Sequence, residues 1–458
     1  MRSAGILLAI LALLCACQSA PAAEPQRPNI LVLLSDDVGW GEYGFQGAHD
    51  IPTPNIDSIA RNGVRFSQGY VSGPYCSPTR AGLLTGRYQT RFGHEFNSVA
   101  NQHGLPAAET TLAERLKALG YATCAVGKWH LGGQPQYRPM RRGFDEFYGT
   151  LANTPFFHPR LVDSRISPDP VPVTDPAFYT TDAYAERAVD WLERHKDQPW
   201  FLYVPFNAQH APLQAPQKYL DRFPNVTDER RKLFSAMMSA MDDAVGRIVG
   251  KVRDLGQERR TLIVFTSDNG GPTAQTTSRN GGLRGFKAST WEGGVRVPFC
   301  MQWTGKIPPG RSFEWPIIQL DVHPTALAAA GAKVERSWKL DGVNLLPYVT
   351  GQNPKAPHET LYWRFGQQWA IRHGSWKLVK ANTGGPQPLL FNLRDDPGEQ
   401  KDLSLAEPEK QSELQKKWDL WNAEQAEPIV PKEVPAAQRP GRAARRNRAT
   451  PRGGANPP

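Results

Sequence analysis

The sequence is poor in cysteine, with five among 458 residues. Cys15 and Cys17 lie in an N-terminal segment with the features of an export signal, which leaves three cysteines for the mature chain. An odd number this small excludes a fold held together by a framework of disulfides. Cys124 and Cys300 lie in apolar runs typical of strands, and we interpret them as buried thiols. Cys76 has different surroundings.

Long hydrophobic runs are also lacking. The apolar run over residues 6–14 follows Arg2 and is too short to span a bilayer, which takes about 20 residues. Together with the small residues after it, this run predicts an export signal over residues 1–23. Residues 20–22 (APA) are typical of ordinary signal cleavage, whereas residues 14–17 (LCAC) resemble a bacterial lipobox. We expect a periplasmic or secreted protein without a transmembrane helix in the mature chain, with a lipid-anchored lipoprotein as the alternative.

A strong excess of one charge is lacking in the body of the chain. Of the net charge of +10, residues 431–458 carry +6, because seven basic residues accompany Glu433, and residues 25–430 carry the other +4. The C-terminal segment is rich in Pro, Arg, Ala and Gly, which predicts a disordered basic tail. Contact of this tail with an anionic polymer or a membrane surface is the alternative. The mildly basic body gives no indication of nucleic acid binding, and we expect none.

The length of the chain suits two domains. In residues 25–350, apolar strand patterns alternate with helix patterns, which predicts an α/β catalytic domain with a large, mostly parallel sheet sandwiched by helices. Residues 351–430 predict a smaller antiparallel sheet with one helix packed on it. The proline-rich residues 135–180 are expected to form an irregular rim.

The predicted elements have the following bounds. Strands are expected over residues 28–37, 121–126, 200–206, 261–266, 297–303, 361–365, 368–372, 376–380 and 389–392. Helices are expected over residues 56–61, 111–119, 182–195, 228–255, 321–330 and 409–423, with a further helix beginning near Cys76.

Two pairs of oxygen-bearing side chains follow predicted buried strands. Asp36 and Asp37 end the first strand, and Asp268 and Asn269 follow the strand over residues 261–266. In open α/β sheets, ligand groups gather at the carboxyl ends of such strands. A single Asp-Asp pair is ordinarily a solvated turn, but adjacent carboxylates that are buried together repel unless a cation joins them. Four oxygen ligands suit a hard cation, Ca²⁺ before Mg²⁺.

The stretch CSPTRAGLLTGR, which begins at Cys76, is the centre of the functional interpretation. Ser77 is predicted to cap a helix, and Pro78 suits its first turn. Cys76 then lies at the positive end of the helix dipole, with Arg80 one turn along on the same side. This place suits an anion and an activated nucleophile, although a lone cysteine is ordinarily a small buried thiol.

This stretch resembles the sulfatase signature, Cys-x-Pro-x-Arg followed by Leu-x-x-Gly-Arg. Over nearly its whole mature length the chain resembles the type I sulfatases of the alkaline phosphatase superfamily, and secreted bacterial carbohydrate sulfatases most of all. The resemblance implies an alkaline-phosphatase-like fold and the hydrolysis of sulfate esters. It also implies that a formylglycine-generating enzyme oxidises Cys76 to formylglycine (3-oxoalanine). As a hydrated gem-diol, that residue attacks sulfur through one hydroxyl, and its other hydroxyl then expels sulfate.

The resemblance assigns the remaining site residues. The metal, Ca²⁺, is held by Asp36, Asp37, Asp268 and Asn269, and the residue made from Cys76 completes its shell. The sulfate group is bound by Lys128, His210 and Lys287, whereas Arg80 and His130 orient the formylglycine. His210 is also a candidate general acid, because histidine is charged near neutral pH. For each basic residue taken singly, a surface lysine or a loop histidine is the ordinary interpretation.

The expected substrate is a sulfated carbohydrate. Residues 205–216 (PFNAQHAPLQAP) look closer to carbohydrate than to steroid sulfatases, so we expect a sulfated polysaccharide or glycosaminoglycan. His94 is a candidate for sugar contact, with a purely structural loop as the alternative, and Thr150, Asn153 and Thr154 are candidate donors to the sulfate. Two other functions stay open: a phosphodiester or phosphonate monoester hydrolase of the same superfamily, and a non-catalytic sulfated-glycan-binding protein.

Overall fold

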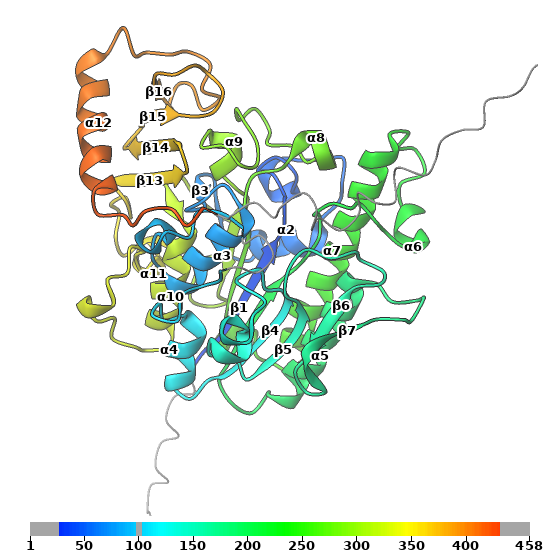
Figure 1. Ribbon diagram of the computed structural model, residues 1–458. Coiled ribbons are helices and arrows are strands. Elements are labelled where there is room, and N and C mark those ends of the chain that lie inside the picture. The colour runs from blue at the N-terminus through cyan, green and yellow to red at the C-terminus, as the bar shows by residue number, and fades with distance from the viewer. Residues whose placement is uncertain (1–26, 98–102, 431–458) are drawn as a thin grey trace, which may run out of the picture.

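The computed structural model describes residues 27–97 and 103–430, so the predicted signal segment and basic tail lie outside the described residues. A ten-stranded sheet forms the centre of the fold (Figure 1). Its strands are β1 (Asn29–Ser35), β2 (Val64–Phe66), β4 (Ala122–Lys128), β5 (Glu146–Thr150), β6 (Arg160–Asp163), β7 (Ser167–Pro172), β8 (Trp200–Pro205), β9 (Thr261–Ser267), β10 (Phe299–Gln302) and β11 (Arg311–Phe313). Their order is β11-β2-β10-β9-β1-β8-β4-β5-β6-β7.

The middle of this sheet is parallel, as predicted. Strands β9, β1, β8, β4 and β5 all run in one direction, and Leu31 of β1 lies opposite Leu202 and Ile263. The apolar run of β1 is buried on both faces, as is usual in parallel sheets. Leu31 packs into the core on one face, and Ile30 and Val32 pack into the core on the other. The carboxyl ends of these strands therefore meet at one edge of the sheet.

Helices cover both faces of the sheet. Three of them, α2 (Pro54–Arg61), α5 (Thr180–Arg194) and α7 (Glu229–Asp254), pack in the core on one face. Another three, α3 (Cys76–Thr85), α4 (Leu112–Ala118) and α10 (Val322–Ala329), pack in the core on the other face. Short helices lie in the loops: α6 (Gln217–Leu220), α8 (Thr273–Thr276), α9 (Glu292–Val295) and α11 (Leu346–Val349). The sandwich of helices around a sheet is confirmed.

The predicted small sheet is also confirmed. Strands β13 (Thr360–Phe365), β14 (Gln368–His373), β15 (Trp376–Lys380) and β16 (Leu389–Asn392) form an antiparallel sheet in that order. Helix α12 (Pro408–Asn422) packs on one face, where the rings of Trp369 and Trp418 stack with centroids 4.4 Å apart. On the other face, Trp363 joins a core with Tyr70 and Trp291 of the larger unit. Figure 1 shows the small sheet beside β3 and α9.

Some expectations about local structure were wrong. Residues 135–180 are not an irregular rim throughout, because β5 extends the parallel sheet and β6 and β7 form an antiparallel hairpin at its edge. An edge strand tolerates the prolines of β7, which cannot donate to a neighbouring strand. The short strands β2, β11, β3 (Gly69–Tyr70) and β12 (Ile317–Ile318) were not predicted. Among the described helices, none combines the length and the apolar character that crossing a membrane requires.

Candidate active site

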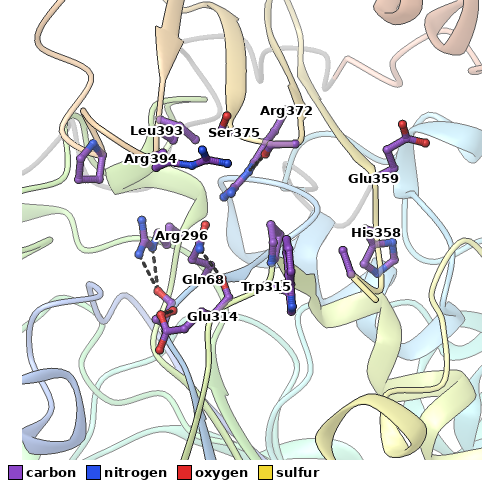
Figure 2. Close-up of a pocket in the computed structure, with 15 residues that line it drawn as sticks. Gln68, Arg296, Glu314, Trp315, His358, Glu359, Arg372, Ser375, Leu393 and Arg394 are labelled. Carbon is purple, nitrogen blue, oxygen red and sulfur yellow. Dashed lines mark hydrogen bonds between the residues drawn. The ribbon is translucent and has the colours of Figure 1, made fainter. Parts of the chain in front are cut away.

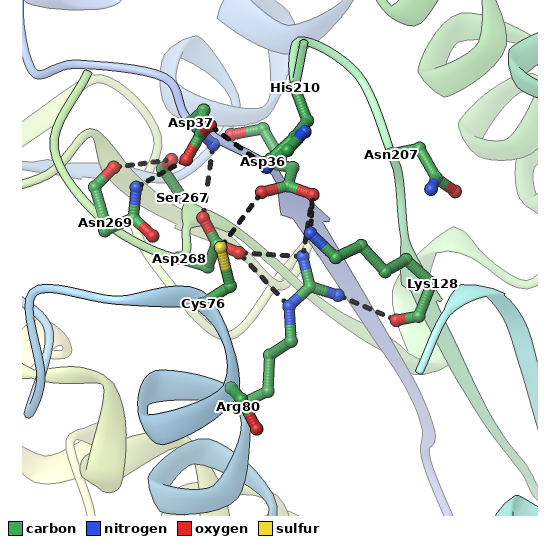
Figure 3. A network of polar contacts seen from close by, with 12 residues as sticks. Asp36, Asp37, Cys76, Arg80, Lys128, Asn207, His210, Ser267, Asp268 and Asn269 are labelled. Atoms are coloured by element: carbon green, nitrogen blue, oxygen red, sulfur yellow. Dashed lines mark hydrogen bonds and ion pairs between the residues drawn. The ribbon is translucent and has the colours of Figure 1, made fainter. Parts of the chain in front are cut away.

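The ends of β1 and β9 bring the two predicted oxygen pairs together (Figure 3). Asp36 and Asp37 follow β1, Asp268 and Asn269 follow β9, and all four side chains are buried. The backbone N–H of Asp37 donates to Oδ1 of Asp268 over 3.2 Å, and Nδ2 of Asn269 donates to Oδ1 of Asp37 over 2.8 Å. Asp37 has a φ of 64°, a conformation uncommon outside glycine that is often found at functional sites.

Helix α3 presents Cys76 to this cluster. Sγ of Cys76 lies 3.6 Å from Oδ1 of Asp36. The expected cap by Ser77 was wrong, because the helix begins at Cys76 and Tyr75 is the N-cap residue. The backbone N–H of Ser77 instead donates to Oδ1 of Asn97 over 3.0 Å. Burial raises the pKa of the Cys76 thiol, which is the opposite of what a reactive thiolate needs.

Three cations lie among the three carboxylates of the site. Arg80 donates from Nη2 to Oδ2 of Asp268 over 2.8 Å and lies 3.5 Å from Oδ2 of Asp36. Lys128, at the end of β4, donates from Nζ to Asp36. Lys287 donates from Nζ to Oδ2 of Asp37 over 2.8 Å. The sequence had placed all of these residues in one site, and the structure brings them together.

The two predicted histidines lie at the same edge of the sheet. Nε2 of His210 is 3.6 Å from Oδ2 of Asp37. Burial and the charge of Lys128 lower the pKa of His210 to about 4, although Asp37 opposes this shift. His130 has a φ of 59°, and its buried Nδ1 has no hydrogen-bond partner among the described residues. Burial and the charges of Lys128 and Arg80 hold the pKa of His130 well below its ordinary value.

His94 has a different place from the one expected. Its imidazole is fully buried, and Nε2 lies 2.7 Å from Oγ of Ser77 at the start of α3. Burial lowers the pKa of His94 to about 3. The expected contact with a sugar is therefore not what the structure shows. His94 is part of the segment that contacts the start of α3, which agrees with the structural alternative.

Asn207 is a neighbour of this site that was not predicted from the sequence (Figure 3). Asn207 follows β8, accepts a hydrogen bond from the hydroxyl of Tyr184 over 2.7 Å and donates from Nδ2 to Oγ1 of Thr150 over 3.3 Å. Of the candidate sulfate donors, Thr150 is therefore tied to the edge of the site, whereas Asn153 is exposed. The rule that pointed to Asp36, a polar residue directly after a buried strand, applies equally to Asn207.

The geometry fits a hard cation. Ligand atoms of Asp36, Asp37, Cys76 and Asp268 all lie within 4.8 Å of one another. Oδ1 of Asn269 is buried and has no hydrogen-bond partner among the described residues. A buried acceptor without a donor is uncommon, and a bound cation would satisfy it. Apart from the Cys76 sulfur, every donor is an oxygen, as Ca²⁺ and Mg²⁺ prefer.

Comparison with known proteins identifies the class. The family model described as Sulfatase matches residues 28–332, and the model described as N-sulphoglucosamine sulphohydrolase, C-terminal, matches residues 286–425. The chain therefore belongs to the sulfatase family and is a hydrolase of sulfuric esters. The resemblance to the type I sulfatases that was found from the sequence is confirmed.

Individual relatives span most of the chain. N-acetylgalactosamine-6-sulfatase of Sus scrofa is 34% identical, over 89% of this chain and 87% of that protein. The uncharacterized sulfatase YdeN of Escherichia coli (strain K12) is 34% identical, over 74% of this chain and 68% of that protein. A solved structure, Ps i-CgsB in complex with k-i-k-neocarrahexaose, is 34% identical with a TM-score of 0.84, and covers 89% of this chain and 96% of that chain.

Proposed function

We propose that this sulfatase removes sulfate from a sulfated carbohydrate, with a formylglycine made from Cys76 and a Ca²⁺ ion in its site. The observation that carries the proposal is the position of Cys76, whose Sγ lies 3.6 Å from Asp36 in a buried cluster of carboxylates and cations. The neutral thiol is a poor nucleophile there, whereas formylglycine supplies an oxygen nucleophile for sulfur. The proposed metal ligands are Asp36, Asp37, Asp268 and Asn269, together with the modified residue.

The balance of charge in the site supports an anionic substrate. The carboxylates of Asp36, Asp37 and Asp268 are matched by the cations of Arg80, Lys128 and Lys287, as the ion pairs on these residues indicate. A divalent ion adds two positive charges that these residues do not neutralise. The single negative charge of a sulfate ester offsets part of this excess in a site of low dielectric constant, where such attraction is strong.

Each basic residue has a proposed part in the reaction. Lys128 and Lys287 hold the sulfate oxygens, where negative charge spreads in the transition state. Arg80 fixes Asp268 through two hydrogen bonds and so orients the metal ligands, and His130 orients the residue made from Cys76. His210 donates a proton to the leaving oxygen. A bound sulfate ester counteracts the effect of Lys128 on the imidazole and favours its charged form.

The substrate class follows from the relatives. The Sus scrofa relative is named for N-acetylgalactosamine 6-sulfate, and the similar solved structure holds a neocarrahexaose. Both relatives are about one third identical to this chain and cover most of it. A sulfated polysaccharide or glycosaminoglycan is therefore the proposed substrate.

The test of this function compares two ester classes on one preparation. We expect the chain to hydrolyse an aryl sulfate far faster than an aryl phosphodiester, and Cys76→Ala to abolish turnover. Cys124→Ala is the matched control, because this buried thiol lies on β4 outside the carboxylate cluster. Faster turnover of the phosphodiester would favour the alternative hydrolase. Binding of sulfated glycan without turnover of either ester would favour the non-catalytic binder.

The metal proposal has its own test. Chelation is expected to remove Ca²⁺ and activity together, and Asp268→Asn is expected to lower the calcium content of the purified protein. Mg²⁺ is expected to restore less activity than Ca²⁺, because it demands stricter octahedral geometry. Full activity in protein shown to be free of metal would contradict the assignment.

Several wider features belong to this proposal. We infer that residues 1–23 direct export, as a cleaved signal or a lipoprotein signal, and that a formylglycine-generating enzyme acts on Cys76 during maturation. Residues 25–350 are proposed as the catalytic domain and residues 351–430 as the C-terminal subdomain. Residues 431–458 are proposed as a basic tail that takes no part in turnover of small substrates.

A further inference from the structure

A second cleft lies between the large sheet and the small C-terminal sheet (Figure 2). Its volume is about 540 Å³, and it is separate from the site around Cys76. The walls come from residues 67–68 after β2, residues 314–316 after β11, residues 358–359 before β13, the turn between β14 and β15, and the loop after β16. We call it the arginine cleft, because Arg296, Arg372 and Arg394 line it.

Strand β14 relates the arginine cleft to the active site. At one end of β14, Gln368 donates from Nε2 to the carbonyl of Ala288 over 2.9 Å, directly beside the active-site Lys287. Towards the other end, Arg372 lines the arginine cleft. Four residues of strand span roughly 13 Å at about 3.3 Å per residue. The two sites are therefore distinct, and β14 contributes a residue to the lining of one and to the surroundings of the other.

Two of the three arginines are buried and donate their hydrogen bonds to neutral oxygens, and both lie near the buried Glu292, to which the hydroxyl of Tyr70 donates over 2.6 Å. Arg296 is 9% exposed and donates from Nε and Nη2 to the carbonyl of Ser67. Its nearest carboxylate, Glu292, lies 3.7 Å away. Arg372 is 6% exposed, donates to the carbonyl of Gly374 and to the hydroxyl of Tyr70, and has no ion pair among the described residues. Buried cations are normally paired with an anion.

The third arginine and a tryptophan complete the lining. Arg394 is exposed, and its guanidinium has no hydrogen bond or ion pair within the described part of the chain. Trp315 is 50% exposed, and its ring stands between Arg296 and His358 in the cleft (Figure 2). An exposed tryptophan offers a large, rigid, flat surface for contact at a low entropic cost.

Two carboxylates, those of Glu314 and Glu359, line the cleft beside the three arginines. Both carboxylate oxygens of Glu314 accept hydrogen bonds, from Ser67 and Ser312. Glu359 is 83% exposed and lies 3.5 Å from His373. Nε2 of His358 is bonded to the carboxylate of Asp321 over 2.8 Å, so this carboxylate is already paired. Of the three arginines in the lining, Arg394 is thus the one whose guanidinium is not engaged by another described residue, whereas Arg296 is shared with Glu292.

We propose that the arginine cleft is a second binding site, for a sulfated saccharide, which Trp315 holds by a sugar face and the arginines by a sulfate group. Guanidinium groups bind planar or tetrahedral oxyanions through paired N–H donors, and the flat tryptophan ring matches the apolar face of a sugar. The inference extends the proposed function, because it names a site outside the reaction centre for the same class of substrate.

The test uses the full chain with Cys76→Ala, which prevents turnover, and the sulfated hexasaccharide k-i-k-neocarrahexaose as probe. Hydrogen–deuterium exchange with and without the probe locates protected segments independently of activity. We expect protection of residues 311–316 and 372–376, and we expect Trp315→Ala with Arg394→Ala to abolish it while protection near His210 remains. The Trp315→Phe variant should retain much of the protection of residues 311–316 and 372–376. Arg336→Ala is the matched control, because Arg336 is exposed and does not line the cleft.

Steady-state kinetics on protein that keeps Cys76, and can therefore turn over substrate, give a second readout. Trp315→Ala with Arg394→Ala should raise KM for a sulfated polymer by about tenfold and leave turnover of a small aryl sulfate unchanged. Protection that is absent from residues 311–316, or that survives both substitutions, would overturn the second site while leaving the sulfatase proposal intact. Cleft protection in a protein that fails to hydrolyse any sulfate ester would overturn the proposed function and leave the second site standing.

Discussion

At the scale of single residues, Lys287 shows how the site uses its cations. Its Nζ lies 2.6 Å from Oδ1 of Asp37, a proposed metal ligand, and 5.2 Å from the ring centroid of Tyr75, the residue before Cys76. The pKa of Lys287 lies well above its ordinary value, because the surrounding acidic groups outweigh burial. The ammonium group is therefore a fixed positive charge where the sulfate oxygens are proposed to bind.

Replacement of Lys287 by alanine is expected to reduce kcat/KM by about 10²-fold or more for aryl sulfates and saccharides alike, because a preorganised donor to the transition state is lost. The measurement is steady-state kinetics on one substrate of each size. Lys306→Ala is the matched control and should be neutral, because Lys306 is exposed. A loss confined to the large substrate would place Lys287 in glycan binding instead.

At the scale of elements, the loop that carries Lys287 is fastened to the small sheet by a buried charge cluster. Lys377 on β15 lies 2.9 Å from Glu292 at the start of α9 and 2.9 Å from Glu399. All three side chains are buried, and the backbone N–H of Glu292 donates to Glu399 over 2.7 Å. Burial and the charge of Glu292 raise the pKa of Glu399 to about 7, although Lys377 opposes this shift.

Replacement of Lys377 by methionine is expected to lower the free energy of unfolding by about 3 kcal/mol, because breaking a buried ion pair leaves unpaired charge behind. Denaturant unfolding measures the effect. Adding Glu399→Gln should recover part of the lost stability, since it removes one of the two carboxylates that lose the cation of Lys377. Lys416→Met, on the exposed side of α12, should change stability by less than about 0.5 kcal/mol. An equally small effect at Lys377 would contradict the account of this cluster.

Elements with strong periodicity or long apolar runs were predictable from the sequence, and short ones were not. β1 and β9 are seven-residue apolar strands with polar residues at their carboxyl ends, so both the sheet and the proposed metal ligands followed from them. β3 and β12 have two residues each and exist because they pair with one another. The start of α3 was misplaced because the helix begins at Cys76, so Ser77 lies inside its first turn and its backbone N–H donates to Asn97, which is distant in sequence.

At the scale of the whole molecule, buried neutral histidines link stability to pH. His323 on α10 is fully buried, and its Nδ1 lies 2.9 Å from the carbonyl oxygen of Leu84 on α3. Burial lowers the pKa of His323 from 6.5 to about 3. The unfolded chain therefore binds a proton below pH 6.5 that the folded chain does not accept until about pH 3. This part of the stability is fully present above pH 6.5 and is lost progressively as pH falls towards 3.

Replacement of His323 by glutamine is expected to make unfolding less sensitive to acid. Between pH 6 and 4, the folding equilibrium constant of the parent should fall about tenfold more per pH unit than that of the variant, which corresponds to one proton. Denaturant unfolding at several pH values gives both slopes. His49→Gln is the control, since His49 lies in the segment between β1 and α2 and outside the buried core. If the folding equilibrium constants of parent and variant had the same pH dependence, the low pKa of His323 in the folded chain would be contradicted.

The proposed function depends on the chemical state of residue 76, and mass spectrometry of the peptide that spans this residue tests that state most directly. In a preparation with full sulfatase activity per molecule, the account predicts a peptide lighter than the encoded one, unreactive towards thiol reagents and reactive towards aldehyde-specific hydrazides. Protein made in a host without the modifying enzyme should carry the encoded thiol and lack turnover. Intact, alkylatable Cys76 in a fully active preparation would contradict the account.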